Sequence, residues 1–337
     1  MKNIYKLKQW VENYWWKSEK PCLMLRSLSG FYHYLNQYNL KKRFDRREIP
    51  LVPLISVGNI TVGGSGKTPF VVWLVKELQG RGFSPVVLCR GDGGSSQKLR
   101  WVEQGDNASD VGDEAKMLFE QCACPVIRGR DRLQAAGMAA VHGDVLILDD
   151  GFQYRQLQAT LDIVLVPHVG VGNACMLPVG PMREPVSALQ RADMVVRTGG
   201  KKAKQLSAQK EWWWWAKPNL LKDINTAQQV PPKEMLALTS IARPQRFVDA
   251  LRSKYIQVRQ HIFFPDHHVF CQDDIADALS ADFAIAVTAK DAVKLLALWP
   301  LEKPLWVLGQ EPNCEQGLME EIHGHMLRHQ MENHHVG

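Results

Sequence analysis

Residues 51–68 read LVPLISVGNITVGGSGKT, and this stretch decides the predicted fold of the chain. Residues 51–57 form a short run rich in branched apolar side chains, which predicts a strand buried on both faces of a parallel sheet. The rest is rich in glycine and ends in Lys67 and Thr68, and the following PFVVWLVKEL has the pattern of an amphipathic helix. A strand, a glycine-rich loop, Lys-Thr and a helix in this order indicate a phosphate-binding loop.

The residue types of this loop suit a nucleoside triphosphate. Backbone N–H groups at its glycines can surround a phosphate, and the helix N-terminus adds a partial positive charge. Lys67 is expected to neutralise the β- and γ-phosphates, and the Thr68 hydroxyl to bind Mg²⁺. The usual pattern, G-x-x-x-x-G-K-S/T, has glycine where this chain has Thr61. The alternative is an ordinary tight turn with Lys67 in solvent, but the flanking elements and the three glycines favour nucleotide binding. The residues predicted to bind the nucleotide are Thr61, Gly63, Gly64, Ser65, Gly66, Lys67 and Thr68.

Length and composition indicate a globular protein of about two domains. The chain has 337 residues, of which 45% are hydrophobic and 23% charged. Its seven cysteines are scattered and odd in number, which argues against a disulfide framework and favours a reducing compartment. No apolar run free of charges is long enough to span a bilayer, so no transmembrane helix is predicted.

The N-terminal arm differs from the rest of the chain in charge. Residues 1–50 contain eleven Lys/Arg against four Asp/Glu, whereas the whole chain has a net charge of +6. Aromatic and aliphatic residues recur there at helical spacing, and Lys41, Lys42 and Arg43 follow. This pattern is typical of a helix that lies in the interface of an anionic membrane. A helix packed on its own protein is the alternative. No recognisable nucleic-acid-binding module accompanies the arm, so we expect no nucleic-acid partner.

Beyond the phosphate loop, short apolar runs alternate with helical patterns, which predicts an α/β fold with a parallel sheet. Ligand sites in such sheets lie at the carboxyl ends of the strands. The run at 144–148 ends in Asp149 and Asp150, a Walker-B arrangement that places a carboxylate near Mg²⁺, although acidic residues there also cap helices. By composition alone, Asp113 is a helix N-cap, and residues 178–185, PVGPMREP, are a surface turn.

Seven motifs in this order and spacing resemble the tetraacyldisaccharide 4'-kinases: VGNITVGGSGKTP, RGDGG, VGDEA, DDGFQ, LPVGPMREP, FPDHHVF and VTAKDAVK. The resemblance extends from the basic arm to about residue 310. It implies a phosphate-loop NTPase domain with a parallel sheet, a smaller α/β domain and an N-terminal amphipathic membrane-associated helix. Enzymes of this family use ATP and Mg²⁺ to phosphorylate the 4'-hydroxyl of a tetraacyldisaccharide 1-phosphate, a lipid A precursor. They act as peripheral proteins at the cytoplasmic face of the bacterial inner membrane.

The resemblance also implies site residues. Asp113 matches a catalytic aspartate that pairs with a histidine, here His267, and we expect the two to come from different domains. Such a pair can take the proton from a sugar hydroxyl that attacks the γ-phosphate. Arg90 and Arg183 match phosphate contacts. The implied metal ligands are Thr68, Asp149, Asp150 and Glu184. The chain departs from the family at Asp92, where tyrosine is usual, and at Ala289, where glutamate is usual.

Taken together, these patterns divide the chain into an arm (1–44), a phosphate-loop kinase domain (45–198), a smaller α/β domain (199–310) and a tail (311–337). Four consecutive tryptophans at 212–215 suggest core packing rather than a lipid contact. The leading hypothesis is a lipid kinase. The alternative is a membrane-associated phosphate-loop NTPase switch that controls a partner protein. A switch would share the loop and the arm but has no need of Asp113 and His267, and no guanine-reading Asn-Lys-x-Asp motif is present.

Overall fold

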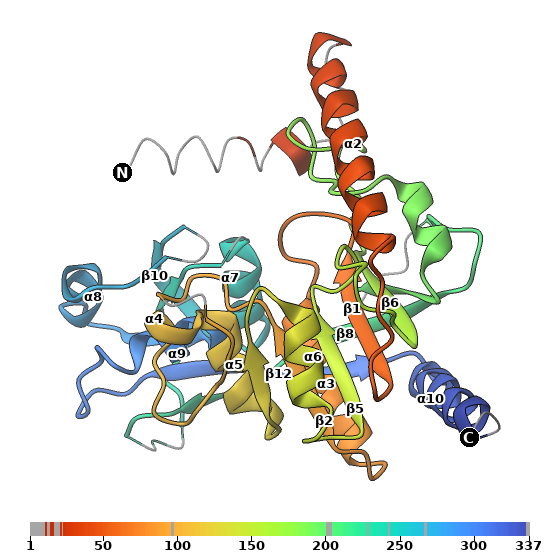
Figure 1. Cartoon of the computed structure of the whole chain (residues 1–337). Helices are drawn as coiled ribbons and strands as arrows, with labels where there is room; N and C mark the ends of the chain where they lie inside the picture. The colour runs from red at the N-terminus through yellow and green to blue at the C-terminus, as the bar shows by residue number, and fades with distance from the viewer. Residues whose placement is uncertain are drawn as a thin grey trace. The chain divides into compact units, whose positions relative to one another are not determined.

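The computed structural model of the chain describes residues 11, 14–16, 21, 23–95, 98–199, 204–226, 228, 230–241, 243–265 and 268–334. The chain divides into two compact units (Figure 1). Unit 1 comprises Met1–Arg90, Cys124–Trp215 and Cys314–Gly337. Unit 2 comprises Gly91–Ala123 and Ala216–Asn313. The predicted domains were consecutive, whereas each of these units is assembled from separate segments.

Unit 1 is built on a parallel sheet. Its strand order is β8-β7-β6-β1-β5-β2-β4, and the registered pairs in it are parallel. The strands are β1 (Leu54–Asn59), β2 (Pro85–Cys89), β4 (Val126–Arg128), β5 (Val145–Asp149), β6 (Leu161–Pro167), β7 (Met194–Thr198) and the first part of β8 (Glu211–Asp223). Every residue of β1, β2, β4 and β5 is buried, as expected for strands covered on both faces. The predicted α/β fold with a parallel sheet is confirmed.

The helices of unit 1 are α2 (Leu23–Phe44), α3 (Lys67–Gln79), α6 (Arg132–Ala139), the 3₁₀ helix η1 (Val186–Arg191) and α10 (Leu318–His334). Of these, α3, α6 and α10 pack on strands of the sheet. Helix α3 packs on β1, β2 and β5 through a buried face that includes Phe70 and Leu74. In β8, Trp212 and Trp214 are buried, and Trp214 contacts Phe70 at 5.5 Å between ring centroids. The tryptophan run therefore contributes to the core, which confirms the packing interpretation.

The strands of unit 2 are also parallel, in the order β10-β9-β11-β12. Its strands are β9 (Glu234–Thr239), β10 (Gln257–Phe263), β11 (Ala284–Thr288) and β12 (Trp306–Cys314), and β3 (Arg100–Trp101) also belongs to this unit. Its helices are α4 (Ala108–Val111), α5 (Asp113–Cys122), α7 (Pro244–Ser253), α8 (Gln272–Leu279) and α9 (Ala289–Leu295). Helix α5 packs against α9, and this packing places the VGDEA motif in unit 2.

No helix among the described residues combines the length and the apolar character needed to cross a bilayer.

A close approach in unit 1 fixes the turn that follows β5. The registers pair Val57 of β1 with Asp149 of β5, so the turn begins beside the end of β1. A Cβ atom at Gly58 would lie 2.4 Å from the Cβ and 2.7 Å from the backbone N of Phe152. Only glycine lets these two backbone segments come so close.

We expect Gly58→Ala to lower the free energy of unfolding by about 1–3 kcal/mol, because the added methyl must displace the turn at Phe152. Gly137→Ala is the matched control. Gly137 lies inside α6, and no atom lies within 4 Å of its Cβ position, so alanine there is neutral or stabilising by up to about 1 kcal/mol. Urea unfolding of both variants measures the difference. Equal stability of Gly58→Ala and wild type would show that the turn moves without cost.

Candidate active site

The phosphate loop has the backbone conformation that its glycines permit. Gly63 and Gly66 both have φ of +81°, in the left-handed region that other residues rarely adopt. Gly63 and Gly64 are exposed, and no atom lies within 4 Å of either Cβ position. Helix α3 begins directly after the loop, at Lys67. An exposed glycine backbone at a helix N-terminus fits a phosphate group.

The loop is supported from the interior by hydrogen bonds. Thr198, the last residue of β7, donates its hydroxyl to the Ser65 carbonyl at 2.8 Å, and Asn59 donates its side-chain amide to the Ser65 hydroxyl at 2.9 Å. Thr61 is completely buried and forms an isolated bridge with Met182. The burial of Thr61 contradicts its predicted direct contact with the nucleotide. Its role is to connect the loop to residues 178–185.

The carboxylate of Asp150 forms ion pairs with basic side chains from two other segments. Arg183 donates Nη1 to both carboxylate oxygens, at 3.0 and 2.8 Å, and the Lys67 Nζ lies 3.4 Å from Oδ1. Burial alone would raise the pKa of the Asp150 carboxyl. The charges of Lys67 and Arg183, together with the Arg183 hydrogen bonds, outweigh burial and hold this pKa well below its usual range. Asp150 therefore stays ionised and holds both cations close to the phosphate loop.

Asp149 and Thr68 offer the oxygen donors that Mg²⁺ prefers. Asp149 is the last residue of β5, which lies beside β1, and Thr68 is in the first turn of α3. Among the described residues, no group of three or more His, Cys, Asp or Glu side chains is placed to hold a metal alone. Mg²⁺ in kinases does not need one, since phosphate oxygens and waters complete its coordination. The donor set thus fits Mg²⁺ bound together with a nucleotide.

Glu184 has a different environment from the one predicted. It is completely buried, and its oxygens accept hydrogen bonds from Arg191 at 2.7 Å and from Arg155 at 3.2 Å. Gln153 donates to it at 3.0 Å and also to the Asn59 carbonyl at 2.8 Å. With both oxygens occupied and no exposed surface, Glu184 does not fit a metal ligand. It instead ties residues 178–185 to the turn after β5.

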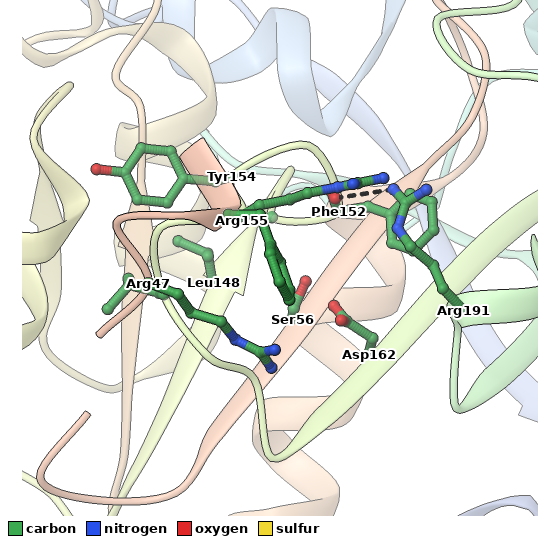
Figure 2. A pocket seen from close by; sticks show the side chains of 11 residues that line it. Arg47, Ser56, Leu148, Phe152, Tyr154, Arg155, Asp162 and Arg191 are labelled. Atoms are coloured by element: carbon green, nitrogen blue, oxygen red, sulfur yellow. Dashed lines mark hydrogen bonds between the residues drawn. The ribbon is translucent and has the colours of Figure 1, made fainter. Parts of the chain in front are cut away.

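The same arginines border a cavity of about 160 Å³ (Figure 2). Figure 2 shows Arg191 beside Phe152, with its hydrogen bond to the Phe152 carbonyl, and its guanidinium lies 3.7 Å from the centroid of that ring. Arg47, Ser56 and Asp162 also line this cavity. Gly151 and Phe152, of the turn that carries Asp150, line this cavity, and Arg191 holds that turn through the Phe152 carbonyl.

In unit 2, Asp113 is the first residue of α5 and is almost completely buried. The N-cap of α5 is Gly112, so the prediction from composition alone, that Asp113 is the N-cap, is wrong. Lys294 and Lys290 lie near its Oδ2, at 3.4 and 3.6 Å. His267 lies outside the described residues. Both motifs, VGDEA and FPDHHVF, fall within the segments of unit 2 rather than in different units.

The sequence matches the family described as Tetraacyldisaccharide-1-P 4'-kinase over residues 22–327. The chain belongs to this family. A protein of Dechloromonas aromatica named Tetraacyldisaccharide 4'-kinase is 34% identical over 329 residues, which cover 94% of this chain and 97% of that protein. Its namesake in Aeromonas salmonicida is 37% identical over 247 residues, 72% of this chain and 74% of the relative.

A solved structure is also similar to this kinase family member. It is the crystal structure of LpxK from Aquifex aeolicus, described as an "apo" form in complex with ATP. The TM-score is 0.75 at 26% identity, and the match covers 90% of this chain and 99% of that one. This likeness supports ATP as the nucleotide of the family's fold.

Several residues around the phosphate loop of unit 1 and around Asp113 of unit 2 were not singled out from the sequence. They are Thr198, which supports the loop, Arg155 and Arg191, which hold Glu184, and Lys290 and Lys294, which face Asp113. Only the two lysines carry a sequence signal, because their spacing of four residues puts them on one face of a helix. The predicted phosphate contact Arg90 follows the end of β2 and is exposed.

We expect Glu184→Gln to lower the free energy of unfolding by about 3–5 kcal/mol, because it leaves two arginines beside a neutral group. Glu77→Gln is the control, since Glu77 forms a partly exposed ion pair with Arg81 within α3 and the turn after it, worth about 0.5 kcal/mol. Chemical denaturation measures both variants. A metal ligand would behave differently: Glu184→Gln would leave stability unchanged and raise the Mg²⁺ concentration needed for half-maximal activity.

Proposed function

We propose that this kinase family member transfers the γ-phosphate of ATP to the 4'-hydroxyl of a tetraacyldisaccharide 1-phosphate. The observation that carries the proposal is the meeting of Lys67, Asp150 and Arg183 beside an exposed glycine loop. Phosphoryl transfer needs positioning and positive charge more than covalent chemistry, and this arrangement supplies both. Family membership identifies the class of acceptor, a tetraacyldisaccharide 1-phosphate.

The chain's residues have distinct roles in this mechanism. The backbone of residues 63–68 binds the phosphates, while Lys67 and Arg183 offset the negative charge that develops on the transferred group. Asp150 holds these two cations in place. Arg90 is a further phosphate contact. Thr68 and Asp149 would hold Mg²⁺, which would neutralise charge on the β- and γ-phosphates.

Asp113 and His267 activate the acceptor. The 4'-hydroxyl loses its proton as its oxygen attacks the γ-phosphorus and the bond to the β-phosphate oxygen breaks, with ADP as the leaving group. His267 takes the proton, and Asp113 stays ionised to orient and stabilise the charged imidazole, as the carboxylate does in other His–Asp pairs. The two lysines beside Asp113 favour this assignment, since they stabilise its negative charge.

We expect Lys67→Ala to reduce transfer of labelled γ-phosphate to tetraacyldisaccharide 1-phosphate by at least about 10²-fold, because the transition state loses a counter-charge. Lys76→Ala is the control, since Lys76 is exposed in the last turn of the same helix. ATP hydrolysis without lipid is measured in parallel. Label in the lipid supports a kinase. Hydrolysis without transfer would instead support the NTPase switch.

The membrane surface is the proposed location of the acceptor, and α2 is the proposed contact. One face of α2 docks on unit 1, where Asn36 donates to the Arg183 carbonyl at 2.8 Å and Ser29 to the Met176 carbonyl at 2.6 Å. The stripe Leu28, Phe31, Leu35 and Tyr38 is left exposed. Lys41, Lys42 and Arg43 follow in the last turn. An exposed apolar stripe with a basic end suits an anionic bilayer surface.

We expect the double variant Phe31→Ser/Tyr38→Ser to bind anionic vesicles more weakly than wild type, because it removes two large side chains that are 65% and 64% exposed. The control is Val141→Ser/Leu301→Ser, which removes exposed apolar side chains elsewhere. Vesicle co-sedimentation at low and high salt measures binding. If both double variants sediment like wild type, α2 is not the membrane contact.

A further inference from the structure

Two lysines of α9 face the carboxylate of Asp113. The Nζ atoms of Lys294 and Lys290 lie 3.4 and 3.6 Å from the same oxygen, Oδ2. The lysines are four residues apart, so they share one face of α9, and α9 packs against α5. They belong to the VTAKDAVK motif, whose lysines enter the proposed mechanism only as charges beside Asp113.

Lys294 is held more firmly than a surface lysine. Besides Asp113, its ammonium contacts the Ser240 hydroxyl at 3.0 Å and the His268 carbonyl at 3.2 Å, and its side chain is only 7% exposed. Burying an ammonium is costly unless it is paired and hydrogen-bonded. These three partners provide that compensation, so the ammonium has one defined position.

Asp291 in turn fixes Ser240. It is completely buried and accepts hydrogen bonds from the hydroxyls of Ser240 at 2.5 Å, Thr239 at 2.6 Å and Thr288 at 2.6 Å. Thr288 also caps α9, because its hydroxyl accepts from the Asp291 N–H. A buried polar network in which each member has partners is rigid. The position of Lys294 therefore follows from the fold of unit 2 itself.

Lys294 also connects Asp113 to the FPDHHVF motif. The carbonyl that it contacts belongs to His268, the residue after His267 in the chain. His268 is itself anchored, since its Nε2 lies 2.9 Å from Asp274 and its ring stacks on Phe264 at 4.6 Å between centroids. One ammonium thus joins Asp113 to the FPDHHVF motif.

We propose that Lys294 is a positioning residue for Asp113, with Lys290 as a second and more exposed cation on the same oxygen. The proposal rests on the proposed function, in which Asp113 is the charged partner of the base. A carboxylate in that role must remain ionised and fixed, because a displacement of about 1 Å can cost about 10² in rate. Lys294 meets both conditions through its charge and its fixed position beside Asp113.

The test is Lys294→Met, which keeps the length of the side chain and removes its charge. We expect kcat for lipid phosphorylation to fall by about 10–10²-fold, while KM for ATP changes less than about threefold. Lys294→Arg, which keeps the charge, should recover part of kcat. Lys303→Met is the matched control, since Lys303 donates to the Leu279 carbonyl in the same unit and should leave kcat unchanged. Wild-type kcat in Lys294→Met overturns the proposal.

The same substitution in an Asp113→Asn background separates positioning from general stability. If Lys294 acts through Asp113, Lys294→Met has little further effect on the residual kcat of Asp113→Asn. If Lys294→Met lowers kcat by the same factor in wild type and in Asp113→Asn, the proposal is overturned. Where Lys294→Met does not fold, Lys290→Met takes its place, with an expected loss of about three- to tenfold that disappears in Asp113→Asn. Full transfer by Asp113→Asn would instead refute the proposed role of Asp113.

Discussion

The site in unit 1 depends on one carboxylate held between two cations. Asp150 brings together Lys67 at the start of α3 and Arg183 of the loop at 178–185, which are far apart in the sequence. This meeting requires the turn after β5 to lie directly on β1, and the lack of a side chain at Gly58 permits that approach. The parallel register of β1 and β5 then places Asp150 at the end of β1 that leads into the phosphate loop. The packing of the backbone therefore determines where the charged groups of this site lie.

The elements of this arrangement with a local signal could be predicted from the sequence. The strands, the glycine-rich loop and the helix after it each have a recognisable local sequence. Burial on both faces restricts the strands to apolar residues, and a left-handed backbone conformation favours glycine in the loop. The position of Asp149 and Asp150 at the end of a buried strand could be predicted in the same way, since they follow an apolar run. The tryptophan run could also be interpreted as core, because four consecutive tryptophans are too apolar for an ordinary exposed loop, and Trp212 and Trp214 are buried.

Roles that depend on distant partners could not be predicted. The family resemblance implied that Glu184 and Asp149 are both metal ligands. Glu184, however, is paired with Arg155 and Arg191, which lie outside the LPVGPMREP motif. Thr61 occupies a loop position that usually contacts phosphate, yet the bridge to Met182 draws it into the interior. The division into units failed to follow sequence order for a similar reason. The packing of α5 on α9 joins segments more than 160 residues apart, and no local pattern encodes it.

A common electrostatic arrangement recurs at three carboxylates in the described residues. Asp150 faces Lys67 and Arg183, Glu184 faces Arg155 and Arg191, and Asp113 faces Lys290 and Lys294. One negative charge between two positive ones does not neutralise them. It fixes their positions and leaves a positive charge in excess. For Asp150 that excess stands beside an exposed loop, where a polyphosphate can use it, whereas for the completely buried Glu184 it serves packing alone. The same motif of charges is thus functional or structural according to whether a ligand can reach it.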